Sequence, residues 1–214
     1  MSTPTRARGE LARAARRAQL LAAAAGRFDA AGFEATTMAD VAERAGVSKG
    51  TTYLYFPSKE ALFLKLLGVA LAEWAGEARE RIAASRSRST RALARTLAAT
   101  LASRPRLLRL LALLHPVLEN RADLDSVLAF QRALLRDLGS LAALLEQRLA
   151  DLRPGEGMRL LLRLHALAVG LAPLGERPAR VRETVAADPE LAVLEIDFER
   201  ELADSLTALI DGWR

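Results

Sequence analysis

The residues best suited to bind a chemical group lie in one short segment, between Thr37 and Phe56. From Ser48 to Tyr55 this segment reads Ser-Lys-Gly-Thr-Thr-Tyr-Leu-Tyr, with hydroxyls, one ammonium and a glycine where a buried helix would carry leucine. Hydroxyl and ammonium groups donate hydrogen bonds to phosphate oxygens, and glycine permits a close backbone approach. The segment therefore suits a helix that docks in a groove of nucleic acid.

Groups for catalysis or metal binding are scarce by comparison. The chain has no cysteine, which excludes disulfides, thiolate nucleophiles and zinc ribbons, and its two histidines, His115 and His165, are far apart in sequence. The sequence has no glycine-rich phosphate loop, Ser-His-Asp order, metal-spaced histidine pair or paired-carboxylate motif. We therefore predict that the protein is not an enzyme and uses no metal and no cofactor.

The size and charge of the chain further restrict the class of protein to which it can belong. The 214 residues are 51% hydrophobic and 27% charged, enough for a packed core, and the net charge is +5. Six arginines and one glutamate fall in the first 27 residues, so a basic N-terminal arm, residues 1–14, is predicted to precede the first domain. No uninterrupted apolar run approaches the ~18 residues of a membrane span. We expect a cytoplasmic protein with no membrane partner.

The elements that position these residues are predicted to be helices throughout. Apolar residues recur at intervals of three and four, and the alternation typical of strands is rare. The fold class is therefore all-α, with about nine helices. Capping and stop residues predict a first helix that ends at Gly32 and further helices over 38–45, 49–55, 59–81, 90–103 and 107–118. A longer helix starts at Asp123 and ends at Pro154-Gly155, and another follows over 156–174. A last helix starts at Asp188-Pro189 and is lined by residues 198–213.

The segment 37–56 has the pattern of a helix-turn-helix. Val41 and Ala42 face inward on its first helix, Ala45-Gly46-Val47 forms a tight turn, and Ser48 caps the second helix. We assign six positions of this region to a small core of three helices in preference to DNA contacts. These positions are Phe28, Val41, Val47, Thr52, Phe56 and Leu62.

A wider pattern of turn, cap and aromatic residues surrounds this motif: Phe28…Gly32-Phe33…Thr36-Thr37…Ala42…Ala45-Gly46-Val47-Ser48-Lys49-Gly50-Thr51…Tyr53…Tyr55-Phe56…Ser58-Lys59-Glu60…Leu62. Residues 15–67 thereby resemble the DNA-binding domain of the tetracycline-repressor (TetR) family of bacterial transcriptional regulators. The resemblance covers about a quarter of the chain. It implies a helix-turn-helix DNA-binding domain over residues 15–57 and a helical effector-binding and dimerisation domain over residues 58–214.

The resemblance also implies which residues contact DNA. Thr37, Lys49, Tyr55 and Lys59 are expected at the DNA backbone, while Gly50 lets the recognition helix come close. Leu54 and Tyr55 depart from the family pattern, in which many members carry Tyr or Arg and then His, so the operator sequence does not follow. The full expected set is Thr37, Ser48, Lys49, Gly50, Thr51, Tyr53, Leu54, Tyr55 and Lys59.

The C-terminal helices indicate a homodimer. Segments 156–174 and 198–213 carry more apolar surface than one small domain can cover, and two copies of each would form a four-helix interface. The alternative is one helix pair within a single chain. We expect Leu164 and Leu206 in the interface, and we assign His165 to the same packing.

A small-molecule site should be mostly apolar with a few polar groups. The resemblance implies that helices between residues 90 and 174 receive the ligand. His115, which precedes Pro116, also predicts a helix kink with a freed carbonyl. The candidate ligand residues are Trp74, Arg109, His115, Asn120, Phe130 and Gln131, with Glu119, Met158 and His165 in a wider set; each also fits an ordinary core position.

Together these features predict a repressor released from a palindromic operator by a small apolar or amphipathic molecule. Its partners would be double-stranded operator DNA, an effector of unknown identity and a second copy of the chain. Two alternatives stay open: the same fold controlled by a protein partner, or an all-helical carrier or enzyme whose basic N-terminus is incidental.

Overall fold

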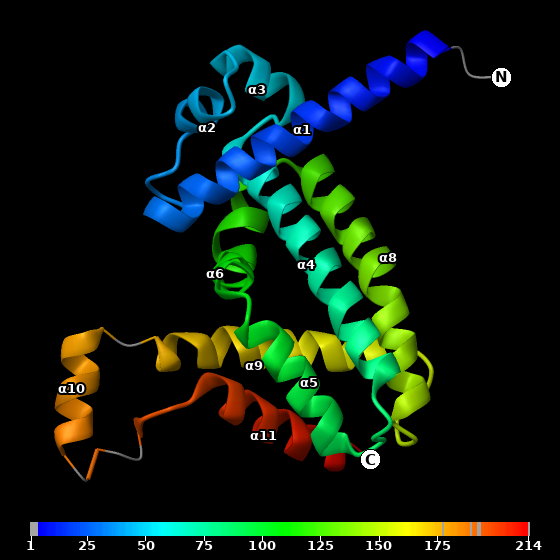
Figure 1. Cartoon of the computed structure of the whole chain (residues 1–214), viewed down its shortest axis with the longest axis vertical. Coiled ribbons are helices and arrows are strands. Elements are labelled where there is room, and N and C mark those ends of the chain that lie inside the picture. Colours follow the sequence, from blue (N-terminus) through cyan, green and yellow to red (C-terminus); the bar gives the residue numbers. More distant parts are fainter. Residues whose placement is uncertain (1–3, 177, 189, 192–193, 214) are drawn as a thin grey trace. The chain divides into compact units, whose positions relative to one another are not determined.

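The computed structural model describes residues 4–176, 178–188, 190–191 and 194–213, and these residues form helices and connecting turns without a strand (Figure 1). The all-α prediction is therefore confirmed. The elements are α1 Pro4–Ala31, α2 Met38–Arg44, α3 Lys49–Tyr55, α4 Lys59–Ala84, α5 Thr90–Ala102, α6 Pro105–Leu113, the π-helical turn η1 Leu114–Leu118, α7 Glu119–Arg121, α8 Leu124–Arg148, α9 Glu156–Gly175, α10 Ala179–Ala187 and α11 Phe198–Asp211.

The chain divides into two compact units, Met1–Val69 with Leu113–Arg132, and Ala70–Ala112 with Ala133–Arg214. The division falls inside α4; the expected functional boundary between residues 57 and 58 stays a prediction. The first turns of α4 belong to the first unit because Phe63, which is fully buried, packs edge-on against two phenylalanines of the α1 region. Its ring centroid lies 5.5 Å from that of Phe28 and 4.8 Å from that of Phe33.

Glycines end the first two helices as the sequence predicts. Gly32 follows α1 with φ +79° and Gly46 follows α2 with φ +64°, a left-handed conformation that side chains rarely adopt. The expected small core is also present, since Phe28, Val41 and Thr52 are buried together with Phe56 and Leu62, while Val47 is half-buried.

The N-terminal segment is helical where we expected an arm. Helix α1 begins at Pro4, so residues 4–14 continue the same helix that later reaches the core. Proline suits the first position of a helix, and the alanine, arginine, leucine and glutamate that follow favour helical backbone.

The kink expected at His115-Pro116 takes the form of a π-helical turn. Pro116 has no N–H to donate, which interrupts the normal hydrogen-bond ladder. The N–H of Glu119 instead donates to the carbonyl of Leu114, five residues back. The side-chain amide of Asn120 donates to the carbonyl oxygen of His115 at 2.9 Å, so this carbonyl has a partner.

In the second unit, α11 packs against α5 and α9. The core includes Trp74, whose indole N–H donates to the hydroxyl of buried Thr100 at 3.1 Å. Glu77 of α4 accepts hydrogen bonds from Arg104 and from Arg81, and the bond from Arg104 is the main cause of its lowered carboxyl pKa. These contacts tie α4 to α5 and to the start of α6.

The last part of the chain differs from expectation. The predicted helix start at Asp188-Pro189 is wrong: Asp188 ends α10, a helix that we did not expect, and Pro189 lies outside the described residues. Helix α11 begins at Phe198, where the Asp197 carboxylate accepts the N–H of Arg200 at 2.8 Å. This cap is a local signal that decides the true start.

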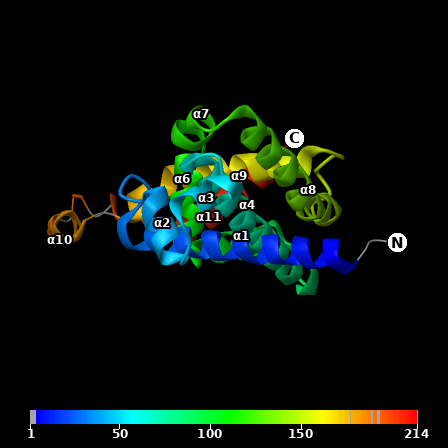
Figure 2. The ribbon, with the colours of Figure 1, turned by 90° about the horizontal axis from the view of Figure 1, so that it is seen from above.

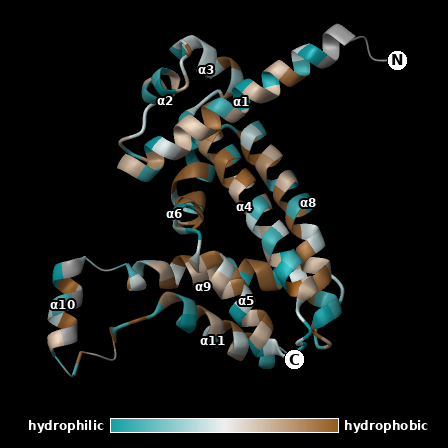
Figure 3. Ribbon diagram, viewed as in Figure 1, coloured by the Kyte–Doolittle hydropathy of each residue, from teal (hydrophilic) through white to brown (hydrophobic). Residues whose placement is uncertain are grey.

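Helix α9 is hydrophobic along most of its length (Figure 3). It is long and apolar enough to cross a membrane, a property that core helices share, and 28% of its most apolar stretch is buried. Leu162 and Leu174 remain 56% and 40% exposed. Leu164 and Leu206, our expected interface residues, are instead 1% and 0% exposed. Helices α9 and α11 pack against each other, and both side chains lie in the core of the protomer.

Candidate nucleic-acid interface

The start of α2 is fixed by a reciprocal cap. The hydroxyl of Thr37 accepts the backbone N–H of Asp40 at 3.2 Å and donates to the Asp40 carboxylate at 2.8 Å, while the N–H of Thr37 donates to that carboxylate at 2.9 Å. These bonds from Thr37, helped by the Arg27 guanidinium 3.6 Å away, hold the pKa of Asp40 below its ordinary value. The cap sets the angle at which the chain enters the helix-turn-helix.

The start of α3 is held in a similar way. The Ser48 hydroxyl accepts the N–H of Thr51 at 3.1 Å and lies 2.8 Å from the Thr51 hydroxyl. On the inner side of the helix, Thr52 is fully buried and its hydroxyl donates to the carbonyl of Lys49 at 2.6 Å. The buried Thr52 and the Ser48 cap therefore fix the orientation of α3, and with it the direction in which its opposite face points.

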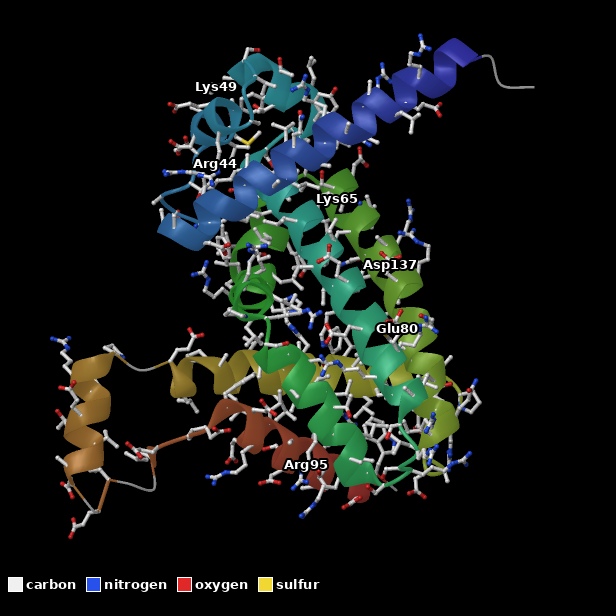
Figure 4. The ribbon with its side chains drawn as sticks, in the orientation of Figure 1. Arg44, Lys49, Lys65, Glu80, Arg95 and Asp137 are labelled. Carbon is white, nitrogen blue, oxygen red and sulfur yellow. The ribbon has the colours of Figure 1, made fainter. Side chains whose placement is uncertain are left out.

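That opposite face of α3 projects into solvent. Leu54 is 84% exposed and Tyr53 is 46% exposed, although both are large apolar or aromatic side chains. Lys49 and Gly50 are also exposed, and Figure 4 shows Lys49 on the outside of the first unit. Thr51 and Tyr55 are half-buried at the edges of the face. An exposed leucine beside an ammonium and a glycine suits a helix that enters a major groove, where leucine would meet a thymine methyl.

Lys59 has a second role that the sequence did not reveal. Its ammonium donates to the carbonyl oxygen of Phe33 at 3.0 Å and lies 4.0 Å from the centre of the Phe33 ring. The Lys59 side chain thus links the start of α4 to the turn that follows α1. Its predicted contact with a phosphate would use the ammonium hydrogens that face away from Phe33, and this contact stays a prediction.

Two arginines beside the motif make contacts that help to position it, and the sequence did not reveal these contacts. The guanidinium of Arg44 lies so close to α1 that a Cβ on Gly26 would stand 2.9 Å from its Nη2 atom. Figure 4 shows Arg44 between α2 and α1. Arg27, which we had counted only as charge, pairs with Asp40. A glycine within the alanine-rich first helix was the available signal, because it indicates close approach of a neighbouring element.

Five of the ligand candidates belong to the first unit, and four of these, His115, Glu119, Asn120 and Gln131, are joined by hydrogen bonds. Glu119 lies 2.7 Å from Nδ1 of His115 and accepts a 3.3 Å hydrogen bond from the Gln131 amide. Asn120 binds the carbonyl of His115 in the same turn. Phe130 is buried, with its ring 3.7 Å from a Cβ position on Gly68.

The other ligand candidates lie in the second unit. Trp74 is a core residue there, and Arg109, Met158 and His165 are half-buried. None of these positions tests the predicted ligand contacts. Within the part of the chain that the structure describes, no three histidine or acidic side chains gather in a way that would hold a metal ion.

Family profiles match nearly the whole chain. The profile described as "Bacterial regulatory proteins, tetR family" matches residues 20–66, and the profile described as "Tetracyclin repressor-like, C-terminal domain" matches residues 69–214.

Curated relatives are similar in the N-terminal region. The HTH-type transcriptional regulator YfiR of Bacillus subtilis is 47% identical over 58 residues, which cover 27% of this chain and 28% of YfiR. The HTH-type transcriptional regulator RutR of Escherichia coli K12 is 43% identical over 60 residues, which cover 28% of each chain. The chain thus matches little more than a quarter of the length of these relatives.

Solved structures are similar over most of the chain. FadR of Thermus thermophilus, a TetR-family repressor solved in complex with lauroyl-CoA, has a TM-score of 0.58 and 26% identity, and the match covers 91% of this chain and 92% of that one. A TetR-family regulator from Streptomyces coelicolor has a TM-score of 0.60 at 21% identity, with 93% and 99% covered.

The cap at Thr37 leads to a test by pH titration. We expect Thr37→Val to raise the pKa of Asp40 toward its ordinary value, because the hydroxyl donor is lost and the backbone donor remains. In the unchanged protein the ionised Asp40 stabilises the fold above its unfolded-state pKa, and this stabilisation is lost as the pH falls through the lowered folded-state pKa. Carboxyl NMR titration measures the shift. Asp123, whose pKa is lowered by Ser126 at the start of α8, is the internal control and should not change.

Proposed function

The chain belongs to the TetR family of bacterial regulatory proteins, and we propose that it is a sequence-specific, DNA-binding transcriptional regulator that represses from a palindromic operator. The exposed face of α3 carries this proposal. A seven-residue helix that is capped at Ser48 and anchored at Thr52 presents Lys49, Tyr53 and Leu54 to solvent. A partner with a phosphate backbone and apolar base edges would cover all three side chains.

A palindromic operator requires two copies of α3, so we propose a homodimer through α9 and α11. The support is the uncovered apolar face of α9 with Leu162 and Leu174. The Arg163 guanidinium lies 3.9 Å from the centre of the Trp213 ring, which joins α9 to the end of α11 on one surface. Two such surfaces would form a four-helix interface.

We further propose release by an amphipathic molecule bound in the C-terminal domain. The support is the likeness to the T. thermophilus FadR that was solved with lauroyl-CoA. Helix α4 is uninterrupted from Lys59 to Ala84, with Phe63 in one unit and Trp74 in the other, so a ligand that changes its direction would change the spacing of the two α3 helices. A hundredfold loss of operator affinity requires a coupling free energy of only about 2.7 kcal/mol.

DNA reading is tested by selecting duplexes from a randomised pool and comparing two variants. Lys49→Ala should weaken binding to all duplexes without changing the selected motif, whereas Tyr53→Ala should also relax base preference. Lys65→Ala removes the same charge from α4 and serves as the matched control. If about six phosphates are neutralised, log K should fall with log salt at a slope near −5. A sequence-specific complex without salt dependence would contradict the proposal.

The dimer is tested with Leu162→Glu, which places a charge on the exposed face of α9 and leaves the protomer core intact. Light scattering should show a dimer for the unchanged protein and a monomer for the variant, with a parallel loss of operator binding. Leu124→Glu, at a leucine of α8 that is 70% exposed, is the control and should remain dimeric. A folded wild-type monomer at micromolar concentration would exclude this interface.

Release is tested with lauroyl-CoA as the probe, and with coenzyme A and laurate separately as controls. Lauroyl-CoA should lower operator affinity roughly a hundredfold, in line with the coupling above. The exposed variants His115→Ala and Gln131→Ala should change the release concentration while ligand-free DNA binding stays as in the wild type. If lauroyl-CoA leaves the complex intact, acyl-CoA is not the effector class, although DNA binding by α3 would stand.

A further inference from the structure

Helix α1 is far longer than its packing requires. The first buried side chain is Leu20, and all described side chains from Arg8 to Gln19 are exposed except Arg16, which is half-buried. Sixteen residues therefore precede the core, a length of about 24 Å in an α-helix. Figure 2 shows this part of α1 extending beyond α2 and α3 in the same unit. We call residues 4–19 the α1 extension.

The face of the α1 extension that continues the buried face of α1 is basic. Leu20 and Ala24 are fully buried in the body of the helix. Arg13, Arg16 and Arg17 stand seven, four and three residues before Leu20, so they share its side of the helix. Arginines thus occupy positions at which the helical period would place core leucines. Arg13 and Arg17 are exposed, and the Arg16 guanidinium donates a 2.9 Å hydrogen bond to the Gln19 side chain of the same helix. A macromolecule that covers this face would have to be anionic.

The electrostatics of an isolated α1 are unfavourable. The first turn of α1 holds no acidic residue, and Glu10 is the one acidic side chain in residues 4–19, against five arginines. Positive charge near a helix N-terminus adds to the positive end of the helix dipole. An exposed helix of this length is also marginal in water. A chain of phosphates beside the extension would neutralise its arginines.

We propose that the α1 extension is a second DNA-contact element, which lies along the phosphate backbone of the duplex next to the half-site bound by α3. This inference rests on the proposed DNA binding and adds a surface outside the helix-turn-helix. Alanines at 12, 14, 15 and 18 keep the rest of the extension narrow, which permits a close approach. The three arginines contact phosphates beyond the half-site. The protein therefore covers a longer stretch of the duplex and binds more tightly, without reading further bases.

The test compares Arg13→Gln/Arg16→Gln/Arg17→Gln with the unchanged protein. Both are titrated onto the selected operator as a duplex ending at the half-sites and as a duplex with flanking sequence on each side. Glutamine has nearly the helix propensity of arginine, so the melting temperature should not fall. On the flanked duplex, where about six further phosphates are contacted per dimer, the wild-type salt slope should steepen from about −5 to about −10; the triple variant should bind roughly 10- to 100-fold more weakly and return the slope to about −5. The wild type should bind the flanked duplex more tightly than the short duplex, whereas the triple variant should bind both duplexes equally.

A matched pair of single variants tests the orientation of the face. Arg17→Gln and Arg8→Gln remove equal charge from the α1 extension, but the two residues lie roughly 180° apart around the helix. Arg17→Gln should cause the larger loss; equal losses would overturn an oriented contact. Unchanged affinity and slope for the triple variant, with Lys49→Ala still weakened, would overturn the inference and leave α3 as the contact. If the wild type binds no duplex, the proposed function itself fails and the inference with it.

Discussion

The proposed DNA-binding surface depends on the burial of Phe63 against Phe28 and Phe33. Helices α2 and α3 have seven residues each, well below the length at which an isolated helix persists in water, so packing and caps must hold them. The aromatic contact joins α1 to α4. The Lys59 ammonium adds a second link between α4 and the end of α1, because it contacts both the ring and the carbonyl oxygen of Phe33. These contacts hold α1 and α4 together, and the caps at Thr37 and Ser48 then orient α3 so that its exposed face points to solvent.

The second unit uses a different mixture of forces. Trp74 and Glu77, one turn apart on α4, are held by Thr100 and Arg104, so one helix face meets both a neutral and a charged partner. Helix α9 approaches α8 so closely that a Cβ on Gly157 would stand 2.2 Å from the carbonyl oxygen of Ala142. Only glycine fits there. This contact buries one side of α9 and leaves Leu162 on the other, which is why one helix serves as protomer core and as candidate interface.

The two basic surfaces of the first unit differ in physical kind. The face of α3 combines one ammonium with apolar and hydroxyl groups, which is a chemistry able to distinguish bases. The face of the α1 extension carries only guanidinium groups, which suit phosphates of any sequence. A regulator that combines both would gain affinity from the second surface while its specificity stays with the first.

The sequence by itself determined the helical fold class, the glycine stops after α1 and α2, the caps at Thr37 and Ser48 and the kink at Pro116. Each of these is set within about five residues, where backbone hydrogen bonds and side-chain caps compete. Only the tertiary structure decided that Leu164 and Leu206 are core, that Lys59 is tied to Phe33, that Gln131 meets Glu119 and that the basic face of α1 continues past the last core contact. Periodicity shows that a helix has an apolar or basic face, but contacts between residues distant in sequence determine what covers that face.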